Sequence, residues 1–159
     1  MKSKYVLLAS TMLISVATFA QKDQIKAAEK ALKAGKSDEA KTILLDAESV
    51  ITNATEAEKA QYYFVKGNVM LDLANKSVDK DANLSLAAGA FQELIEVEKA
   101  SGKSKYTAQA TKSVMDIKYK LINEAIADSK SDKHEVAAKK LYDAYLLDKK
   151  DTINLYYAA

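Results

Sequence analysis

The stretch GKSDEAKTILLDAE, residues 35–48, has the features of a tight turn followed by an amphipathic helix. Gly35 suits the left-handed backbone conformation that ends a preceding helix, and Ser37 is expected to cap the next one. Ala40, Leu44 and Ala47 then recur at the spacing of one helical face. The stretch therefore predicts two helices joined by a short turn, the second with one apolar face.

The same order of small and large apolar residues returns twice along the chain. The stretch SDKHEVAAKKLYDAY, residues 131–145, repeats it after another polar turn. The three sets are Ala40–Leu44–Ala47, Ala87–Phe91–Leu94 and Ala137–Leu141–Ala144. Self-similarity over a period of several tens of residues is typical of proteins built from stacked repeats.

The composition agrees with an all-α fold. The chain has 159 residues, no Pro and four Gly, whereas strand-rich folds use both residues in their turns. It has no Cys, which excludes disulfides, thiolate nucleophiles and Cys-based metal sites. Every basic residue is Lys, and the absence of Arg weakens a nucleic-acid function, because Arg supplies the bidentate contact to phosphate and guanine.

Six helices arranged as three antiparallel hairpins are predicted. A T-x-x-E capping box, Thr55 and Glu58, precedes the third helix. Residues 75–83 are expected to form a polar loop, with Asp81 or Asn83 capping the helix that follows. The helices are expected over about 22–34, 37–51, 62–74, 84–99, 105–129 and 132–147.

These hairpins resemble tetratricopeptide repeats, in which small residues let paired helices approach and a large residue fills the gap to the next hairpin. Residues that fit this motif are Ala28, Gly35, Ala40, Leu44, Ala47, Tyr63, Gly67, Ala125, Ala137, Leu141 and Ala144. The anchors Ala40, Ala87 and Ala137 lie 47 and 50 residues apart, against ~34 for that motif. A HEAT-like or other α-solenoid, with a period of ~40–47 residues, is the alternative. The resemblance covers residues 22–159.

The resemblance implies a binding groove for a protein or peptide, lined by the first helix of each hairpin. The partner-binding positions that it predicts are Glu29, Lys33, Gln61, Phe64, Asn68, Asp72 and Lys130. The same register adds Ile25, Leu71, Ile122 and Ile126. This mixture of apolar and polar side chains suits a peptide segment.

The sequence predicts neither catalysis nor a cofactor nor a metal. It contains no G-x-S-x-G, H-E-x-x-H or P-loop motif. Asp79, Asp81, Asn83 and Ser85 alternate as in a calcium loop, but the required Gly and Glu are replaced by Leu84 and Ala90. The single His134 is expected to pack between helices.

Residues 1–20 have the three parts of a secretory signal peptide. Lys2 and Lys4 precede an apolar stretch that ends in ATFA, with cleavage expected before Gln21. An uncleaved anchor is the alternative, although the uncharged stretch is shorter than the ~20 residues of a spanning helix. Removing residues 1–20 removes two of the 24 lysines and no acid, which leaves 22 lysines against 22 acidic residues.

These features predict a non-catalytic exported scaffold, in the periplasm or at the outer membrane of a Gram-negative bacterium. It would bind a partner protein or peptide and no nucleic acid, and would not span the membrane once the signal is cleaved. The alternatives are a structural subunit of an envelope assembly and the docking module of a larger protein. The ending DTINLYYAA, residues 151–159, predicts either the start of a fourth repeat in an incomplete chain or a short lid over the third hairpin.

Overall fold

The computed structural model describes residues 22–158, and this part of the chain is helical without any strand. Residues 22–33 form the first helix. The elements that follow are α2 (Ser37–Glu48), the 3-10 turn η1 (Ile51–Asn53), α3 (Glu56–Asn75), α4 (Lys80–Ser101), α5 (Thr107–Lys130), α6 (His134–Leu147) and α7 (Ile153–Ala158). The predicted all-α fold is confirmed, and the tetratricopeptide-like character of the repeats stays a prediction. The expected signal peptide lies outside the described residues.

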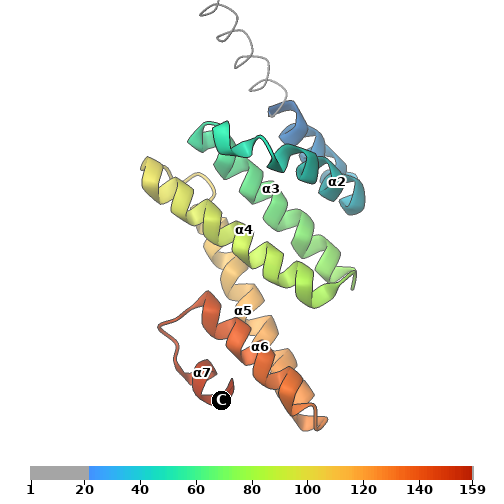
Figure 1. The fold of residues 1–159 in the computed structure, drawn as a ribbon, viewed down its shortest axis with the longest axis vertical. Coiled ribbons are helices and arrows are strands. Elements are labelled where there is room, and N and C mark those ends of the chain that lie inside the picture. The colour runs from blue at the N-terminus through green and yellow to red at the C-terminus, as the bar shows by residue number, and fades with distance from the viewer. Residues whose placement is uncertain (1–21, 159) are drawn as a thin grey trace, which may run out of the picture.

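Consecutive helices pack on one another along the length of the molecule (Figure 1). The most extensive contacts join α3 to α4 and α5 to α6, so these two pairs form the second and third hairpins. The first hairpin consists of residues 22–48, and α3 packs against its second helix, α2. At the other end, α7 folds back beside α6.

The core is a continuous layer of small and large apolar side chains between these helices. Leu44 and Phe91, the large residues of the first two repeated sets, are 1% and 0% exposed. Gly67 marks a close approach of α3 to α4, because a Cβ atom added there would lie 2.6 Å from the Phe91 ring. This contact has the form that the repeat pattern predicts, a small residue on one helix facing a large one on the other.

Two local predictions for the turns are confirmed. Gly35 has φ +75°, and the N–H of Lys36 bonds the carbonyl of Ala31 across the turn that ends the first helix. Thr55 and Glu58 form the expected capping box at the start of α3. Both features depend on residues close together in the chain, and these can be recognised in the sequence.

Four other predictions were wrong: the cap at Ser37, the length of the 75–83 loop, the cap at Asp81 or Asn83, and the packing of His134. Lys36, not Ser37, is the N-cap of α2, and the Ser37 hydroxyl donates to the Asp72 carboxylate of α3 instead. The loop expected over residues 75–83 is shorter, because α4 begins at Lys80. No side-chain cap bond is made there, and Asn83 is buried in the first turn, where its amide donates to the Val78 carbonyl.

The side chain of His134 is exposed rather than packed between helices.

Candidate functional site

Two of the predicted binding residues, Lys33 of the first helix and Gln61 of α3, bond to a third, Glu29 of the first helix. Lys33 Nζ lies 2.7 Å from Glu29 Oε1, and Gln61 of α3 donates to the other Glu29 oxygen at 3.3 Å. The hydrogen bond from Lys33 is the main reason why the pKa of Glu29 lies below its ordinary value. These three polar side chains therefore satisfy one another between the first helix and α3.

The aromatic residue predicted to bind a partner, Phe64, is covered by another aromatic ring. Tyr106, at the start of α5, stacks on Phe64 with 4.4 Å between the ring centroids and 18° between the planes. The amide of Asn68 donates to the Phe64 carbonyl at 2.7 Å. Phe64 and Asn68 therefore take part in intramolecular contacts on the surface where the partner was expected.

A buried carboxylate holds Tyr106 in this place. Glu98 of α4 is 2% exposed and accepts hydrogen bonds from the N–H groups of Tyr106 at 3.0 Å and Thr107 at 2.8 Å, and from the Thr107 hydroxyl at 2.6 Å. Burial raises the pKa of Glu98, but these hydrogen bonds outweigh it and leave the pKa below its ordinary value. The charged carboxylate thus occupies the N-terminal end of α5, where unpaired N–H groups favour an anion.

Asp72 ties α3 to the turn of the first hairpin. Lys76 Nζ lies 2.7 Å from its carboxylate, and the hydroxyl of Ser37 also donates to it. Lys76 bonds the Gly35 carbonyl at 3.0 Å as well. The bond from Lys76, followed by that from Ser37, lowers the pKa of Asp72. The position of Asp72 is explained by these structural contacts.

Lys130 is different, because it lies on the rim of an open apolar groove at the C-terminal end of the molecule. This groove, called the C-terminal groove below, has a volume of about 770 Å³. It is lined by Ile122, Ala125, Ile126, Ser129 and Lys130 of α5, His134, Glu135, Ala137, Ala138 and Leu141 around α6, and Ile153, Asn154, Tyr157 and Ala158 of α7. Its volume falls in the ~300–1,000 Å³ range of ligand-binding sites.

The shape of the C-terminal groove follows from the repeat pattern. Ile122 and Ile126 lie four residues apart on α5 and so share one face of that helix. The small residues Ala125 and Ala137 form part of the lining between α5 and α6, and Leu141 stands beside them. Ile126 is 48% exposed and Tyr157 68%. Charged and polar groups, Lys130 among them, are placed around this apolar surface.

The third wall of the groove, α7, is held by a buried lysine. Lys118 of α5 is 4% exposed, and its Nζ lies 2.9 Å from Asp148 and 2.8 Å from Asp151. Asn154, in the first turn of α7, donates to Asp151 at 3.1 Å. Burial lowers the pKa of Lys118, but the two carboxylates outweigh this effect and raise it above the ordinary value. The charged Lys118 therefore fixes the connection between α6 and α7.

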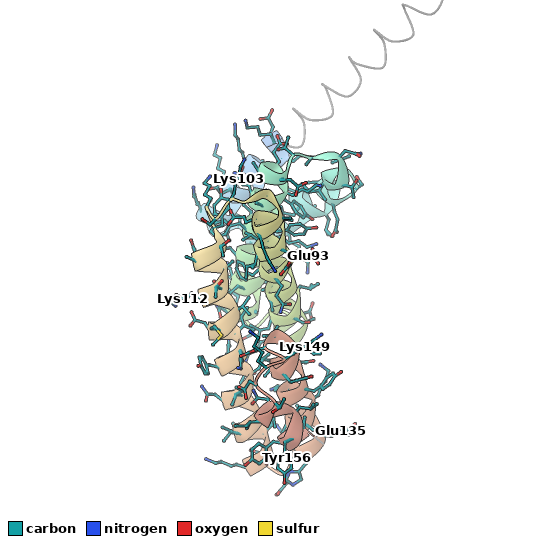
Figure 2. All side chains as sticks on the ribbon, turned by 90° about the vertical axis from the view of Figure 1, so that its left-hand side faces the viewer. Glu93, Lys103, Lys112, Glu135, Lys149 and Tyr156 are labelled. Atoms are coloured by element: carbon teal, nitrogen blue, oxygen red, sulfur yellow. The ribbon has the colours of Figure 1, made fainter. Side chains whose placement is uncertain are left out.

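The outer side of α7 is apolar and exposed. Tyr156 is 78% exposed and Leu155 37%, and neither lines the groove, while Asn154 is the buried residue of this short helix. Figure 2 shows Tyr156 and Glu135 at one end of the molecule, far from Lys103 at the other. The apolar surface around the C-terminal groove thus continues onto α7.

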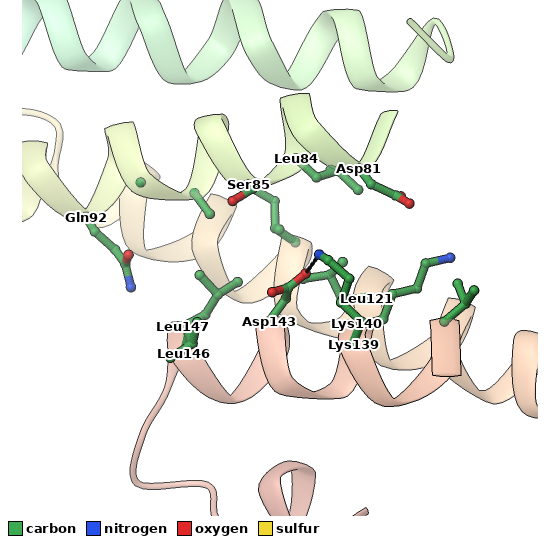
Figure 3. Close-up of a pocket in the computed structure, with 14 residues that line it drawn as sticks. Asp81, Leu84, Ser85, Gln92, Leu121, Lys139, Lys140, Asp143, Leu146 and Leu147 are labelled. Carbon is green, nitrogen blue, oxygen red and sulfur yellow. Dashed lines mark hydrogen bonds and ion pairs between the residues drawn. The ribbon is translucent and has the colours of Figure 1, made fainter. Parts of the chain in front are cut away.

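A second, smaller cavity between α4, α5 and α6 is a structural junction (Figure 3). Its volume is about 280 Å³. Lys139 pairs with Asp143 at 2.7 Å, and Lys140 pairs with Asp128 at 2.7 Å. Lys140 also lies 3.3 Å from Glu124, which binds Lys80 of α4 at 2.6 Å. The Lys80–Glu124 pair joins the second and third hairpins, and the other pairs lie within the third. The charged groups of this cavity thus pair with one another, which leaves the C-terminal groove as the stronger candidate for binding.

Comparison of the chain with family models, with curated proteins and with solved structures gives no match. Across residues 22–158, no group of three or more His, Asp and Glu side chains is placed to hold a metal ion. In the same range, none of the helices combines the length and the apolar character needed to cross a bilayer.

The sequence identified part of the C-terminal groove. Ile122, Ile126 and Lys130 were expected at a binding surface and do line the groove. Leu141 was recognised as a repeat position that fills a gap between hairpins, and its place in an open groove was not expected. The ending, residues 151–159, was expected either to begin a fourth repeat or to form a lid over the third hairpin. Residues 153–158 form the short helix α7 beside α6, and the part of Ile153 and Tyr157 in the groove was not predicted.

Proposed function

We propose that this protein is a non-catalytic, exported scaffold that binds a partner protein or peptide at the C-terminal groove. The proposal rests on one difference between the predicted binding positions: some make contacts within the molecule, and others line an open groove. Those of the first helix and α3 are occupied by contacts such as Phe64 on Tyr106. Those of α5, with Ile126 as their most exposed apolar member, line an open groove.

The character of the groove supports a macromolecular partner. Large apolar side chains with aromatic neighbours, surrounded by a polar rim, are typical of surfaces that anchor another protein. Monomeric proteins rarely expose a contiguous apolar surface of this kind without a partner. The groove and the outer face of α7 together form such a surface around Ile126, Ile153 and Tyr156.

The N-terminal sequence supports export. Residues 1–20 are proposed to direct the chain across the membrane as a cleavable signal, and the protein would then act in the periplasm or at the outer membrane of a Gram-negative bacterium. The remaining chain has equal numbers of lysines and acidic residues, so no long-range charge would attract nucleic acid. The hairpins are proposed to be tetratricopeptide-like repeats.

Site-specific crosslinking tests where the partner binds. A photoreactive residue at Ser129, on the groove, is expected to crosslink one partner in cell envelopes of the source organism. The same residue at Gln109, at the other end of α5, is the control. The partner, once identified, should bind Ile126→Lys about tenfold or more weakly, because a charge replaces an apolar anchor. Tyr119→Lys is the matched control, since Tyr119 is a 56% exposed residue of α5 outside the groove.

Two results would contradict this proposal. One is a partner whose affinity is equal for the wild type, Ile126→Lys and Tyr119→Lys. The other is the absence of any crosslinked partner at Ser129. Light scattering distinguishes the structural-subunit alternative, which predicts that the purified protein forms a permanent oligomer or is unstable alone. The docking-module alternative predicts that these repeats belong to a larger protein whose activity lies in another part of it.

A further inference from the structure

The first hairpin shows what covers the repeat surface elsewhere in this molecule. Tyr62, Val65 and Val69 of α3 are at most 2% exposed and pack in the same core cluster as Leu44. The Tyr62 hydroxyl reaches the Leu44 carbonyl at 3.4 Å. The helix α3 is 20 residues long, and one of its faces therefore covers the side of the first hairpin on which Leu44 lies.

The covering face of α5 has the same spacing. Its buried residues Val114, Ile117 and Leu121 occupy positions i, i+3 and i+7, as Tyr62, Val65 and Val69 do in α3. Ile117 and Leu121 line the cavity between α4, α5 and α6. The whole stripe belongs to the core cluster that contains Leu84 and Phe91 of α4, so α5 packs on the second hairpin. An apolar stripe at i, i+3 and i+7 lies along one side of a helix. Two hairpins of this molecule are thus covered by a helix with the same stripe.

The third hairpin has the corresponding surface and a much shorter cover. Leu141 holds the repeat position of Leu44, but it is partly exposed and lines the C-terminal groove. The six residues of α7 stand where α3 and α5 have 20 and 24. The groove is therefore the part of a helix-binding surface that α7 leaves open.

We infer that the C-terminal groove binds one amphipathic α-helix of a partner protein, with large apolar residues at i, i+3 and i+7. The inference rests on the proposed function and states the chemistry of its partner. The helix would place its stripe against Ile122, Ile126 and Leu141, in the way that α3 places Tyr62, Val65 and Val69 on the first hairpin. Binding of an amphipathic helix in an apolar groove is an established mode of recognition.

A second copy of this chain, stacked end to end, fits the groove poorly. The opposite end of the molecule is the first hairpin, whose exposed residues include Lys26, Lys30 and Asp38. Leu45 is the one large apolar side chain exposed within residues 22–48. Charged side chains placed against the apolar residues Ile122, Ile126 and Leu141 would lose hydration without a compensating contact from them. The polar end is typical of a terminal repeat that faces solvent, and the occupant of the groove comes from elsewhere.

The helix of the protein itself supplies a defined probe. A peptide of residues 55–75 contains the capping box and the stripe of α3. In the first control peptide, Val65→Asp and Val69→Asp interrupt the stripe. In the second, Val65→Pro interrupts the helix. The isotope-labelled protein is purified as the expressing cells process it. Each peptide is then titrated into this protein, and the methyl resonances of its isoleucines are followed by NMR.

The expected result is saturable binding that shifts the methyl resonances of Ile122 and Ile126. Both control peptides should bind about tenfold or more weakly, because each removes the anchoring stripe or its geometry. The protein variant Ile126→Lys should weaken binding by a similar factor, while Tyr119→Lys leaves it within about twofold. Denaturation curves of both variants establish that they fold.

Several outcomes would overturn the inference. They are no binding of the 55–75 peptide, equal binding of the Val65→Pro peptide, and shifts confined to Ile25 and Ile43 of the first hairpin. Concentration-dependent self-association that Ile126→Lys abolishes would identify a second copy as the occupant instead. A crosslinked partner that needs Ile126 but binds as an extended segment would refute the helix and leave the proposed function standing. Absence of both the peptide complex and the crosslinked partner would refute both.

Discussion

The first and third hairpins carry the same repeated residues and differ in what covers them. Leu44 in the first is 1% exposed beneath α3, whereas Leu141 in the third is partly exposed in the C-terminal groove. The outer surface of the first hairpin is charged, and the surface around the third is apolar. The residues of a repeat thus determine its internal packing, while its neighbour determines whether that surface supports the fold or is open for binding.

Replacing the same leucine in both hairpins tests this difference most strongly. Leu44→Ala should lower the free energy of unfolding by about 2–5 kcal/mol, the cost of emptying a fully buried leucine site. Leu141→Ala should cost roughly 1 kcal/mol, because its side chain is already partly in contact with water. Alanine is a good helix former, so helix propensity does not distort the comparison. Urea denaturation of the two variants measures both values, and equal costs would mean that the third hairpin is as well covered as the first.

The second hairpin offers a comparison within the repeat pattern. Ala28 and Leu44 are the small and large residues of the first hairpin, Ala125 and Leu141 those of the third, but the second has Gly67 and Phe91. A Cβ at position 67 would meet the Phe91 ring at 2.6 Å, so Gly67→Ala should cost about 1–3 kcal/mol from overpacking. Gly89→Ala, with no atom within 4 Å of the new methyl group, should instead gain about 0.5–1 kcal/mol from helix propensity.

A double variant sharpens this test. Gly67→Ala combined with Phe91→Leu gives the second hairpin the alanine and leucine of the other two. It should recover part of the stability lost in Gly67→Ala alone, because the shorter leucine leaves room for the methyl group. Thermal and urea denaturation of the single and double variants measure the coupling between the sites. If the two changes simply add, the close contact of Gly67 with Phe91 is not what requires glycine.

The local features of this fold were predictable from the sequence, and the long-range ones were not. Gly35 and the Thr55–Glu58 box depend on residues within one turn, and both formed as expected. Ser37 failed as a cap because the carboxylate of Asp72, 35 residues away, takes its hydroxyl. The calcium-like residues at 79–85 fall mostly within α4, whose first turn buries Asn83.

The candidate site shows the same division. The register implied by the tetratricopeptide resemblance placed Ile122 and Ile126 at a binding surface, and they line the groove. Periodicity gave no sign that Tyr106, 42 residues beyond Phe64, would cover the equivalent surface of α3. Whether a helix face is open depends on which residue from a distant part of the chain packs on it. The spacing of apolar residues within one helix does not predict such a contact.

The smallest expected change in the free energy of unfolding concerns the attachment of α7. This short helix covers the third hairpin only in part, whereas α3 covers Leu44 of the first hairpin fully. Lys118→Met keeps the length and packing of the side chain but removes the charge that holds Asp148 and Asp151. A fully buried pair that loses one partner costs ~3–5 kcal/mol. Here the cost should be about 1 kcal/mol, because the two aspartates are 34% and 33% exposed and water can hydrate them. Lys112→Met, which removes an exposed pair with Asp116, is the matched control and should change stability by less than about 0.5 kcal/mol.

The effect of Lys118→Met should be local and dependent on pH. Hydrogen exchange of the Tyr156 amide, bonded to the Thr152 carbonyl in α7, should become faster while amides of α3 keep their protection. The hydrogen bond from Lys118 lowers the folded pKa of Asp148. Its contribution is therefore present above the unfolded pKa of ~3.9 and is lost as the pH falls through the folded pKa. Acid should release α7 in the wild type, and Lys118→Met should remove this acid dependence. Equal exchange of α7 in the variant and the wild type would mean that apolar contacts in the groove hold α7 without Lys118. A partner helix would then have to displace these contacts rather than fill the space beside α7.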